Sequence, residues 1–232
     1  MKSLIVFDLG ETLLFYEDLA LDWSEHYNGA IDSACRKCMI KVGRKNLERV
    51  SSILLKYNTR RNPRIHEIPA AEIFGEIIDE IGADRNNLSL FISESFKYFQ
   101  RKAVPEKTAI ELLSYLKSRR INIAVLTDVP YGMPNELVLK DLEPFKKYID
   151  FVVTSVDAGF RKPSTQGLQM MLNKFNCKNS DAMFVGNEKK DIDSAKNLGV
   201  FSLLLCPSRE IPHWNQDAAV TKLSDVKNFI DK

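Results

Sequence analysis

The chain has 232 residues, 44% of them hydrophobic, which is enough to bury one large core or two modest ones. Its 33 Lys and Arg nearly balance its 31 Asp and Glu, so we expect neither nucleic acid nor a membrane surface as a partner. Four cysteines, the lack of a secretory leader and the lack of a long apolar run predict a cytoplasmic location.

The first predicted element is a strand, followed by a long helical segment. Leu4 to Phe7 form a continuous apolar run, typical of a strand buried on both faces, and Asp8 to Thr12 end it as a loop. From about residue 17 to residue 100, Gly and Pro are sparse and strand-like runs are absent. Apolar residues at helical spacing over 73–81 and 88–99 predict several helices packed together.

After Pro105 the predicted strands and helices alternate. Apolar residues at helical spacing over 110–116 predict a helix, with Pro105 near its first turn. The remaining predicted elements are strands at 121–126, 151–153, 183–185, 200–205 and 218–220, and helices at 165–175, at 191–198 and near Val226.

This order of elements predicts an α/β fold, a doubly wound, Rossmann-like parallel sheet covered by helices on both faces. The helical segment interrupts that pattern after the first strand, so we interpret it as an inserted all-helical domain. Residues 1–15 and 101–232 form the predicted core, and residues 16–100 form the predicted insertion.

Polar residues gather where the predicted strands end. They are Asp8, Thr127, Asp128, Lys162, Asn187 and Asp191. Open parallel sheets bind ligands beyond the carboxyl ends of their strands, so we expect these residues at one edge. Carboxylates with a Lys and a hydroxyl suit Mg²⁺ and a phosphate, because the cation offsets the repulsion between phosphate and carboxylates. An Asp in line with phosphorus can attack it and form an aspartyl phosphate.

Four segments, in this order, resemble the motifs of the haloacid dehalogenase superfamily of phosphatases. They are Phe7–Leu13, Val125–Asp128, Arg161–Pro163 and Phe184–Ile192. The resemblance covers the predicted core, and the helical segment resembles the family's helical cap, which lies between the first and second motifs. It implies Asp8 as the nucleophile and Mg²⁺ as the cofactor.

The resemblance also implies roles for single residues. The implied phosphate contacts are Leu9, Gly10, Thr127, Asp128 and Lys162, and the implied magnesium ligands are Asp8, the Gly10 carbonyl, Asn187 and Asp191. Two residues depart from the family pattern. Gly10 stands where a second Asp usually serves as general acid and base, a group typically worth ~100- to 10,000-fold in rate. Glu11 is the first candidate to replace it, and Asn187 stands where an Asp is more common.

These features predict a magnesium-dependent phosphatase that hydrolyses a small-molecule phosphomonoester through an aspartyl phosphate. One alternative, motivated by Gly10, is a catalytically weak protein that binds phosphate or a partner. Another is a 2-haloacid dehalogenase, which needs no magnesium and for which the metal-ligand pattern at Asp191 is unnecessary. The sequence indicates neither the substrate nor the oligomeric state.

Two groups of residues in the helical segment have more than one interpretation. Arg60, Arg61 and Arg64 form either a clamp for an anionic substrate or an exposed face. Tyr16, Trp23 and Tyr27 line a pocket or belong to the core of the helical segment, and the sequence does not decide between these.

Overall fold

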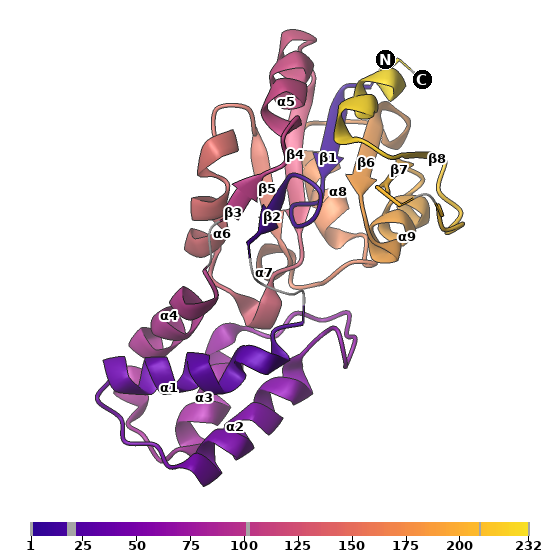
Figure 1. Cartoon of the computed structure of the whole chain (residues 1–232). Helices are drawn as coiled ribbons and strands as arrows, with labels where there is room; N and C mark the ends of the chain where they lie inside the picture. Colours follow the sequence, from indigo (N-terminus) through magenta and orange to yellow (C-terminus); the bar gives the residue numbers. More distant parts are fainter. Residues whose placement is uncertain (1, 18–21, 101–102, 209, 232) are drawn as a thin grey trace. The chain divides into compact units, whose positions relative to one another are not determined.

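The computed structural model describes the chain except residues 1, 18–21, 101–102, 209 and 232. It divides into two compact units (Figure 1). The sheet unit comprises Met1–Phe15, Val104–Asp128 and Asn135–Lys232, and the helical unit comprises Tyr16–Ala103 and Val129–Pro134. None of the described helices is long and apolar enough to cross a membrane.

The sheet unit is built on six strands in the order β5-β4-β1-β6-β7-β8, all parallel. These strands are β1 Leu4–Phe7, β4 Asn122–Thr127, β5 Phe151–Thr154, β6 Ala182–Gly186, β7 Phe201–Leu205 and β8 Ala218–Val220. Their apolar runs place β1, the first strand in the chain, in the middle of the sheet. The predicted α/β class with a parallel sheet is therefore confirmed.

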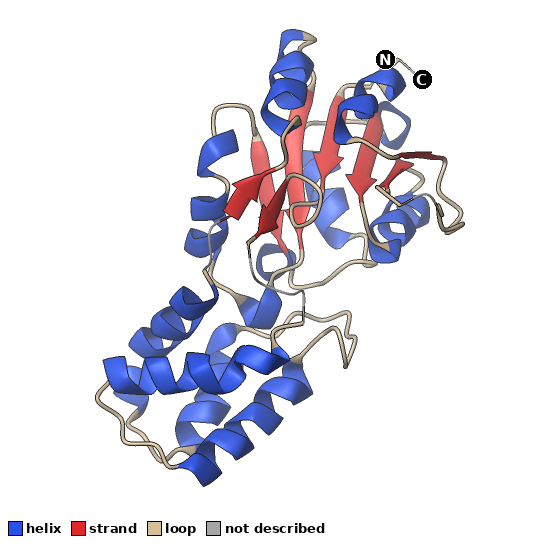
Figure 2. Cartoon of the chain, in the orientation of Figure 1, coloured by secondary structure: helices blue, strands red, loops and turns tan. Residues whose placement is uncertain are grey.

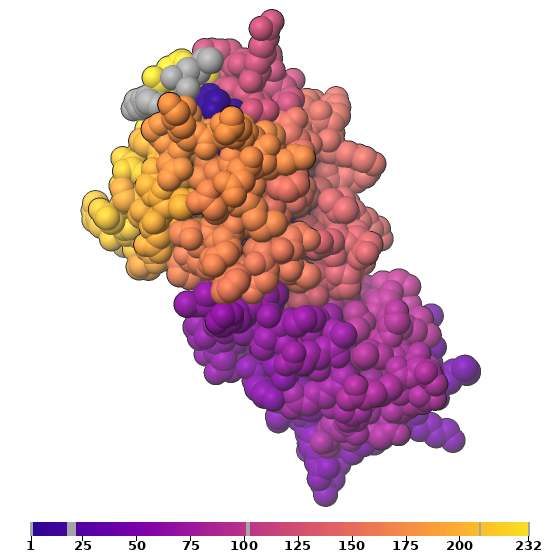
Figure 3. Space-filling view, turned by 180° about the vertical axis from the view of Figure 1, so that it is seen from behind, coloured from indigo at the N-terminus to yellow at the C-terminus, as the bar shows by residue number. Residues whose placement is uncertain are grey.

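Helices cover both faces of this sheet (Figure 2). The α-helices of the unit are α5 Ala109–Ser118, α6 Asn135–Asp141, α7 Ser155–Ala158, α8 Gln166–Lys174 and α9 Lys189–Leu198. Figure 3 shows the face covered by α8 and α9, with the segment that contains them in orange. Alternate strand residues point to this face, among them Val6, Leu126 and Phe184. They form a buried core with Leu168 of α8 and Ala195 of α9.

The α-helices described in the helical unit are α1 Tyr27–Lys37, α2 Arg44–Tyr57, α3 Ala70–Glu80 and α4 Leu88–Phe99. The apolar spacing over 73–81 does form α3, and Gly82 follows with φ 65°, a conformation that favours glycine after a helix. Helix α1 packs on α4, and α3 packs on α2 and α4. Phe74 contacts both Phe91 and Phe96 edge-on, so aromatic residues form much of the interior between α3 and α4.

Short elements account for the differences from the sequence-based predictions. Pro105 ends β3, Ala103–Pro105, which pairs with β2, Leu14–Tyr16. Since α5 starts only at Ala109, the prediction that Pro105 lies near the first turn of that helix was wrong. Short 3-10 helices are η1 Ser24–His26, η2 Arg85–Asn87, η3 Pro130–Gly132, η4 Glu143–Phe145 and η5 Asn179–Asp181, and the last helical element, η6 Leu223–Phe229, is also 3-10. Three-residue strands carry too little apolar pattern to stand out in a sequence.

Candidate active site

Three neighbouring strands end at the candidate site. Asp8 follows β1, Thr127 ends β4 on one side of it, and Gly186 ends β6 on the other. The Asp8 amide donates to the Val185 carbonyl at 2.9 Å, which extends the ladder by one residue and fixes the backbone of Asp8. The chain order of the strands reverses at β1, the position at which ligands bind in such sheets.

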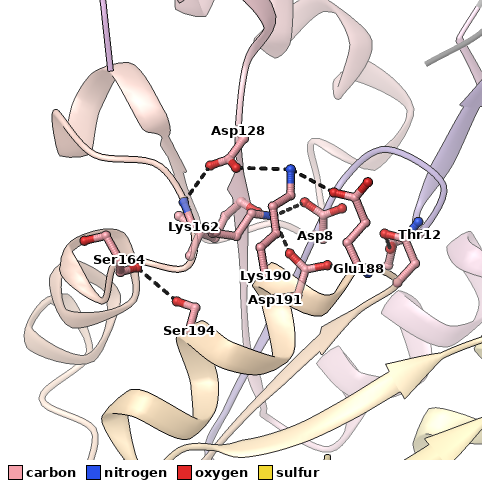
Figure 4. Close-up of polar contacts among 11 residues, drawn as sticks. Asp8, Thr12, Asp128, Lys162, Ser164, Glu188, Lys190, Asp191 and Ser194 are labelled. Atoms are coloured by element: carbon pink, nitrogen blue, oxygen red, sulfur yellow. Dashed lines mark hydrogen bonds and ion pairs between the residues drawn. The ribbon is translucent and has the colours of Figure 1, made fainter. Parts of the chain in front are cut away.

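Lys162 joins the two carboxylates at the centre of the site (Figure 4). Its Nζ lies 2.5 Å from Oδ1 of Asp8 and 2.6 Å from Oδ1 of Asp191. The same Nζ lies 3.4 Å from the Leu126 carbonyl, and the side chains of Lys162 and Asp191 are 2% and 1% exposed. Residues 154 positions apart in the chain thus form a buried cluster of charges.

Burial and charge act in opposite directions on these groups. Burial raises the pKa of Asp8 to about 6, although the Lys162 ammonium pulls this pKa down. Burial also disfavours the Lys162 ammonium, but the carboxylates of Asp191, Asp8 and Asp128 outweigh it and hold the pKa of Lys162 above its ordinary value. Lys162 therefore stays charged near neutral pH, and Asp8 becomes ionised there.

Asp128 supports Lys162 from the end of β4. Its Oδ1 accepts a hydrogen bond from the Lys162 backbone amide at 3.0 Å, and its Oδ2 lies 3.2 Å from Nζ of Lys190. Burial alone would raise the pKa of Asp128, but the charges of Lys162, Lys190 and Arg161 hold it below its usual range. A carboxylate paired in this way repels a phosphate, so the predicted phosphate contact of Asp128 would involve its backbone amide.

The start of α9 fixes Asp191 in the site. Oδ2 of Asp191 accepts a hydrogen bond from the Glu188 amide at 2.9 Å, and the Glu188 carboxylate accepts one from the Asp191 amide in return. Glu188 also lies 2.8 Å from Lys190. Sequence reasoning missed both Glu188 and Lys190, because Glu is not one of the residues that usually cap a helix start and gives no capping signal in the sequence.

Gly186 is needed for this placement of Asp191. A Cβ added at Gly186 would lie 2.5 Å from Cγ of Asp191, closer than real Cβ contacts allow. We expect Gly186→Ala to lower the free energy of unfolding by ~1–3 kcal/mol, because the added methyl group would displace the buried Asp191 side chain. Thermal or urea unfolding measures this effect. Gly43→Ala is the control, since a Cβ there meets nothing within 4 Å, and an equal loss in both variants would contradict the explanation.

The loop after Asp8 contains Gly10, one of the two residues that depart from the family pattern. Gly10 is partly exposed, and an added Cβ would meet nothing within 4 Å. Glu11 has φ 58°, and among the described residues no hydrogen bond or ion pair engages its carboxylate. Thr12 is fully buried, and its hydroxyl donates to Oδ1 of Asn187 at 3.4 Å, a contact that the sequence did not suggest.

The donor set of this site fits magnesium. Oδ1 of Asp191 is buried and, although close to Lys162, accepts no hydrogen bond of acceptable geometry. The described residues contain no cluster of three or more His, Cys, Asp or Glu side chains at metal-binding distances. Magnesium is commonly held by one or two carboxylates with several waters, so Asp8, Asp191, the Gly10 carbonyl and the Asn187 amide oxygen are the groups that could hold it.

Two of the arginines and two of the aromatic residues considered above contact residues of the helical unit itself. Arg61 pairs with Asp22 at 3.0 Å, and Arg64 donates to the Tyr57 carbonyl at 2.7 Å. Tyr27 is buried and belongs to the interior of the unit, whereas Trp23 is partly exposed and stacks on Phe99 with 4.2 Å between ring centroids.

Comparisons with known proteins identify the family of the chain. A family model described as haloacid dehalogenase-like hydrolase matches residues 36–205. Ribulose-1,5-bisphosphate 5-phosphatase of Halopiger xanaduensis is 30% identical over 103 residues, which cover 44% of this chain and 42% of that protein. The match therefore spans less than half of that relative.

Solved structures of two proteins share the fold. A 2-haloacid dehalogenase from Pseudomonas syringae pv. Tomato DC3000 superimposes with a TM-score of 0.72 and 19% identity, covering 98% of this chain and 97% of the other. An HAD phosphatase from Thermococcus onnurineus superimposes with a TM-score of 0.66 and 18% identity, covering 99% of this chain and 98% of the other. At these identities they show the fold alone. Because the family model matches well over half of the residues, the chain belongs to the haloacid dehalogenase-like hydrolases.

Proposed function

We propose that this hydrolase is a magnesium-dependent phosphatase that acts on a small-molecule phosphomonoester through an aspartyl phosphate at Asp8. The observation that carries the proposal is the buried cluster in which Lys162 lies 2.5 Å from Asp8 and 2.6 Å from Asp191. The partial match to a sugar bisphosphate phosphatase supports the same substrate class.

Each residue of the site has a separate role in the proposed reaction. The ionised Asp8 carboxylate attacks phosphorus, the bond from phosphorus to the leaving oxygen breaks, and water later hydrolyses the aspartyl phosphate. Lys162 and the Thr127 hydroxyl offer positive charge and a donor to the phosphoryl oxygens, and the amides of Leu9 and Gly10 add donors. When bound at Asp8, Gly10, Asn187 and Asp191, magnesium supplies the charge that offsets the phosphate dianion.

The helical unit has a separate role in this proposal. Residues 16–100 form the inserted cap, which excludes water and selects the substrate while residues 1–15 and 101–232 carry the chemistry. Tyr27 is buried inside the unit, so other residues of the unit contact the substrate, and the partly exposed Trp23 is one candidate.

A substrate screen tests the proposal directly. The chain is assayed with and without magnesium on an aryl phosphate and on sugar, nucleotide and organic acid phosphates. We expect hydrolysis that disappears on chelation of the metal. Metal-independent release of chloride from 2-chloropropionate, without phosphatase activity, would instead identify a dehalogenase.

Gly10 supports a second candidate function. Without a carboxylate at this position, the chain lacks the usual group that protonates the leaving oxygen and activates water. A protein that accepts or binds phosphate but turns over slowly has the same cluster at Asp8. Fast turnover of any substrate in the panel would exclude this candidate.

We expect the affinity for magnesium to fall in acid, because a proton and the metal compete for Asp8. Burial raises the pKa of Asp8 to about 6. At a pH of about 5, roughly one Asp8 in ten is ionised, so the apparent Kd is expected to be about tenfold weaker than at neutral pH. Calorimetric titration with magnesium at the two pH values measures this ratio. An affinity that does not change with pH would show that Asp8 is not a ligand.

A further inference from the structure

The segment Val129–Pro134 belongs to the helical unit but is joined to the sheet unit at both of its ends. It follows Asp128 of the sheet unit directly, groups with the helices, and returns to the sheet unit at Asn135. The chain therefore passes between the units at four points, where a simple insertion would need two. Pro130 and Pro134 restrict the backbone of this short segment.

The middle of the segment has an unusual backbone conformation. Tyr131 and Gly132 both lie in the left-handed region, with φ 51° and 63°. Glycine suits the second position, because a Cβ there would lie 2.5 Å from the Ala70 amide nitrogen. A tyrosine in this region is disfavoured, so contacts of its side chain must hold it there.

Those contacts lie within the helical unit. The Tyr131 side chain is buried, its hydroxyl shares a short hydrogen bond with the Tyr27 hydroxyl, and the two rings meet edge-on at 6.0 Å. Asn58 donates to the Tyr27 hydroxyl at 2.9 Å and to Asp22 at 2.9 Å. Tyr131 is thus the end of a polar chain that pins the segment to the helices.

The other end of the segment adjoins the candidate active site. Asp128 precedes Val129, and its carboxylate accepts the Lys162 amide at 3.0 Å. Lys162 in turn contacts Asp8 and Asp191. Only two residues, Val129 and Pro130, therefore separate Tyr131, whose side chain is held in the helical unit, from Asp128, whose carboxylate holds the Lys162 backbone.

We propose that Tyr131 is a positioning residue: its hydroxyl anchors the segment Val129–Pro134, and through Asp128 this anchor keeps Lys162 aligned with Asp8. The proposal rests on the proposed phosphatase function and adds a residue that does not touch the substrate. It predicts that loss of the hydroxyl misaligns Lys162 without unfolding the protein.

A double-mutant cycle tests the route through Asp128. Tyr131→Phe is expected to lower kcat about tenfold with little change in KM, since small misplacements at a reacting centre cost up to ~100-fold. In an Asp128→Ala background, the same change is expected to cost less than about twofold, because the connection is already broken. An equal loss in both backgrounds, or no loss in the wild-type background, would overturn the proposal.

Hydrogen exchange of the Lys162 amide gives a readout that is independent of activity. Tyr131→Phe is expected to speed this exchange about fivefold, the effect of losing one hydrogen bond on the local opening equilibrium. Tyr115→Phe, on the surface of α5, is the matched control and is expected to leave it unchanged. If the wild-type chain hydrolyses no phosphate, the proposed function fails, and the exchange measurement still decides the role of Tyr131. Unchanged exchange in Tyr131→Phe would overturn it.

Discussion

Asp8→Asn is expected to abolish phosphatase activity, with kcat reduced by at least ~1,000-fold, because an amide does not attack phosphorus to form the covalent intermediate. The Asp8 carboxylate lies beside Lys162, and no other described Asp or Glu at this site follows β1 so directly. Steady-state hydrolysis of an aryl phosphate measures the loss. Acid-quenched protein analysed by mass spectrometry is expected to carry phosphate on Asp8 in the wild type and none in the variant.

The thermal stability of Asp8→Asn shows whether the variant loses activity because it lacks the nucleophile or because it unfolds. The pKa of Asp8 is raised to about 6 in the folded chain, above its ordinary value of 3.8. The folded state thus holds more protons between these values, and the ionisation of Asp8 lowers stability as pH rises through about 6. We expect Asp8→Asn to remove this cost, so its Tm relative to wild type should rise from acid to neutral pH.

Asp193→Asn is the matched control for this experiment. Asp193 lies on α9 two residues from Asp191, but its carboxylate pairs with Lys189 at 2.6 Å in a partly exposed position. Exposed pairs of this kind contribute ~0–1 kcal/mol, so activity should stay within about twofold of wild type. Activity retained in Asp8→Asn, or lost equally in Asp193→Asn, would contradict a nucleophilic Asp8.

The strand ends are the part of the site that follows from the sequence. Apolar runs that stop at Asp8, Thr127 and Gly186 predict parallel strands, and parallel strands place their carboxyl ends at one edge. The structure brings Asp8, Lys162 and Asp191 together as that topology requires. This part of the prediction needs only the apolar runs of the buried strands and the residues at which the runs stop.

Side-chain partners formed by long-range packing could not be predicted in this way. Lys190 on α9 forms an ion pair with Asp128, which follows β4. Thr12 donates a hydrogen bond to Asn187, which lies 175 positions further along the chain. In sequence, Lys190 is one of two adjacent lysines and looks like a solvated surface residue. The burial of Tyr131 was hidden for a similar reason, since a Pro-flanked Tyr-Gly reads as an exposed turn.

Gly10→Asp is expected to raise kcat, by ~100-fold or more, if the missing acid and base limits turnover. The position accepts a side chain, because an added Cβ meets nothing within 4 Å and Gly10 is outside the left-handed region. The new carboxyl would protonate the leaving oxygen and then take a proton from the attacking water. Steady-state kinetics at saturating magnesium measure the gain, and Gly10→Asn, equal in size but without an ionisable group, is the control.

Glu11 decides how the result at Gly10 is interpreted. Its carboxylate has no hydrogen-bond partner among the described residues, and its φ of 58° turns the backbone sharply just after Gly10. If Glu11 already supplies the proton, Glu11→Gln should lower kcat by ~100-fold or more, and Gly10→Asp should restore the rate in that background. If Glu11 has no such role, Glu11→Gln should leave kcat within about twofold, and Gly10→Asp should give the same gain in the wild-type and Glu11→Gln backgrounds. A gain in Gly10→Asn equal to that in Gly10→Asp would show that the side chain acts by packing, and the acid–base explanation of Gly10 would fail.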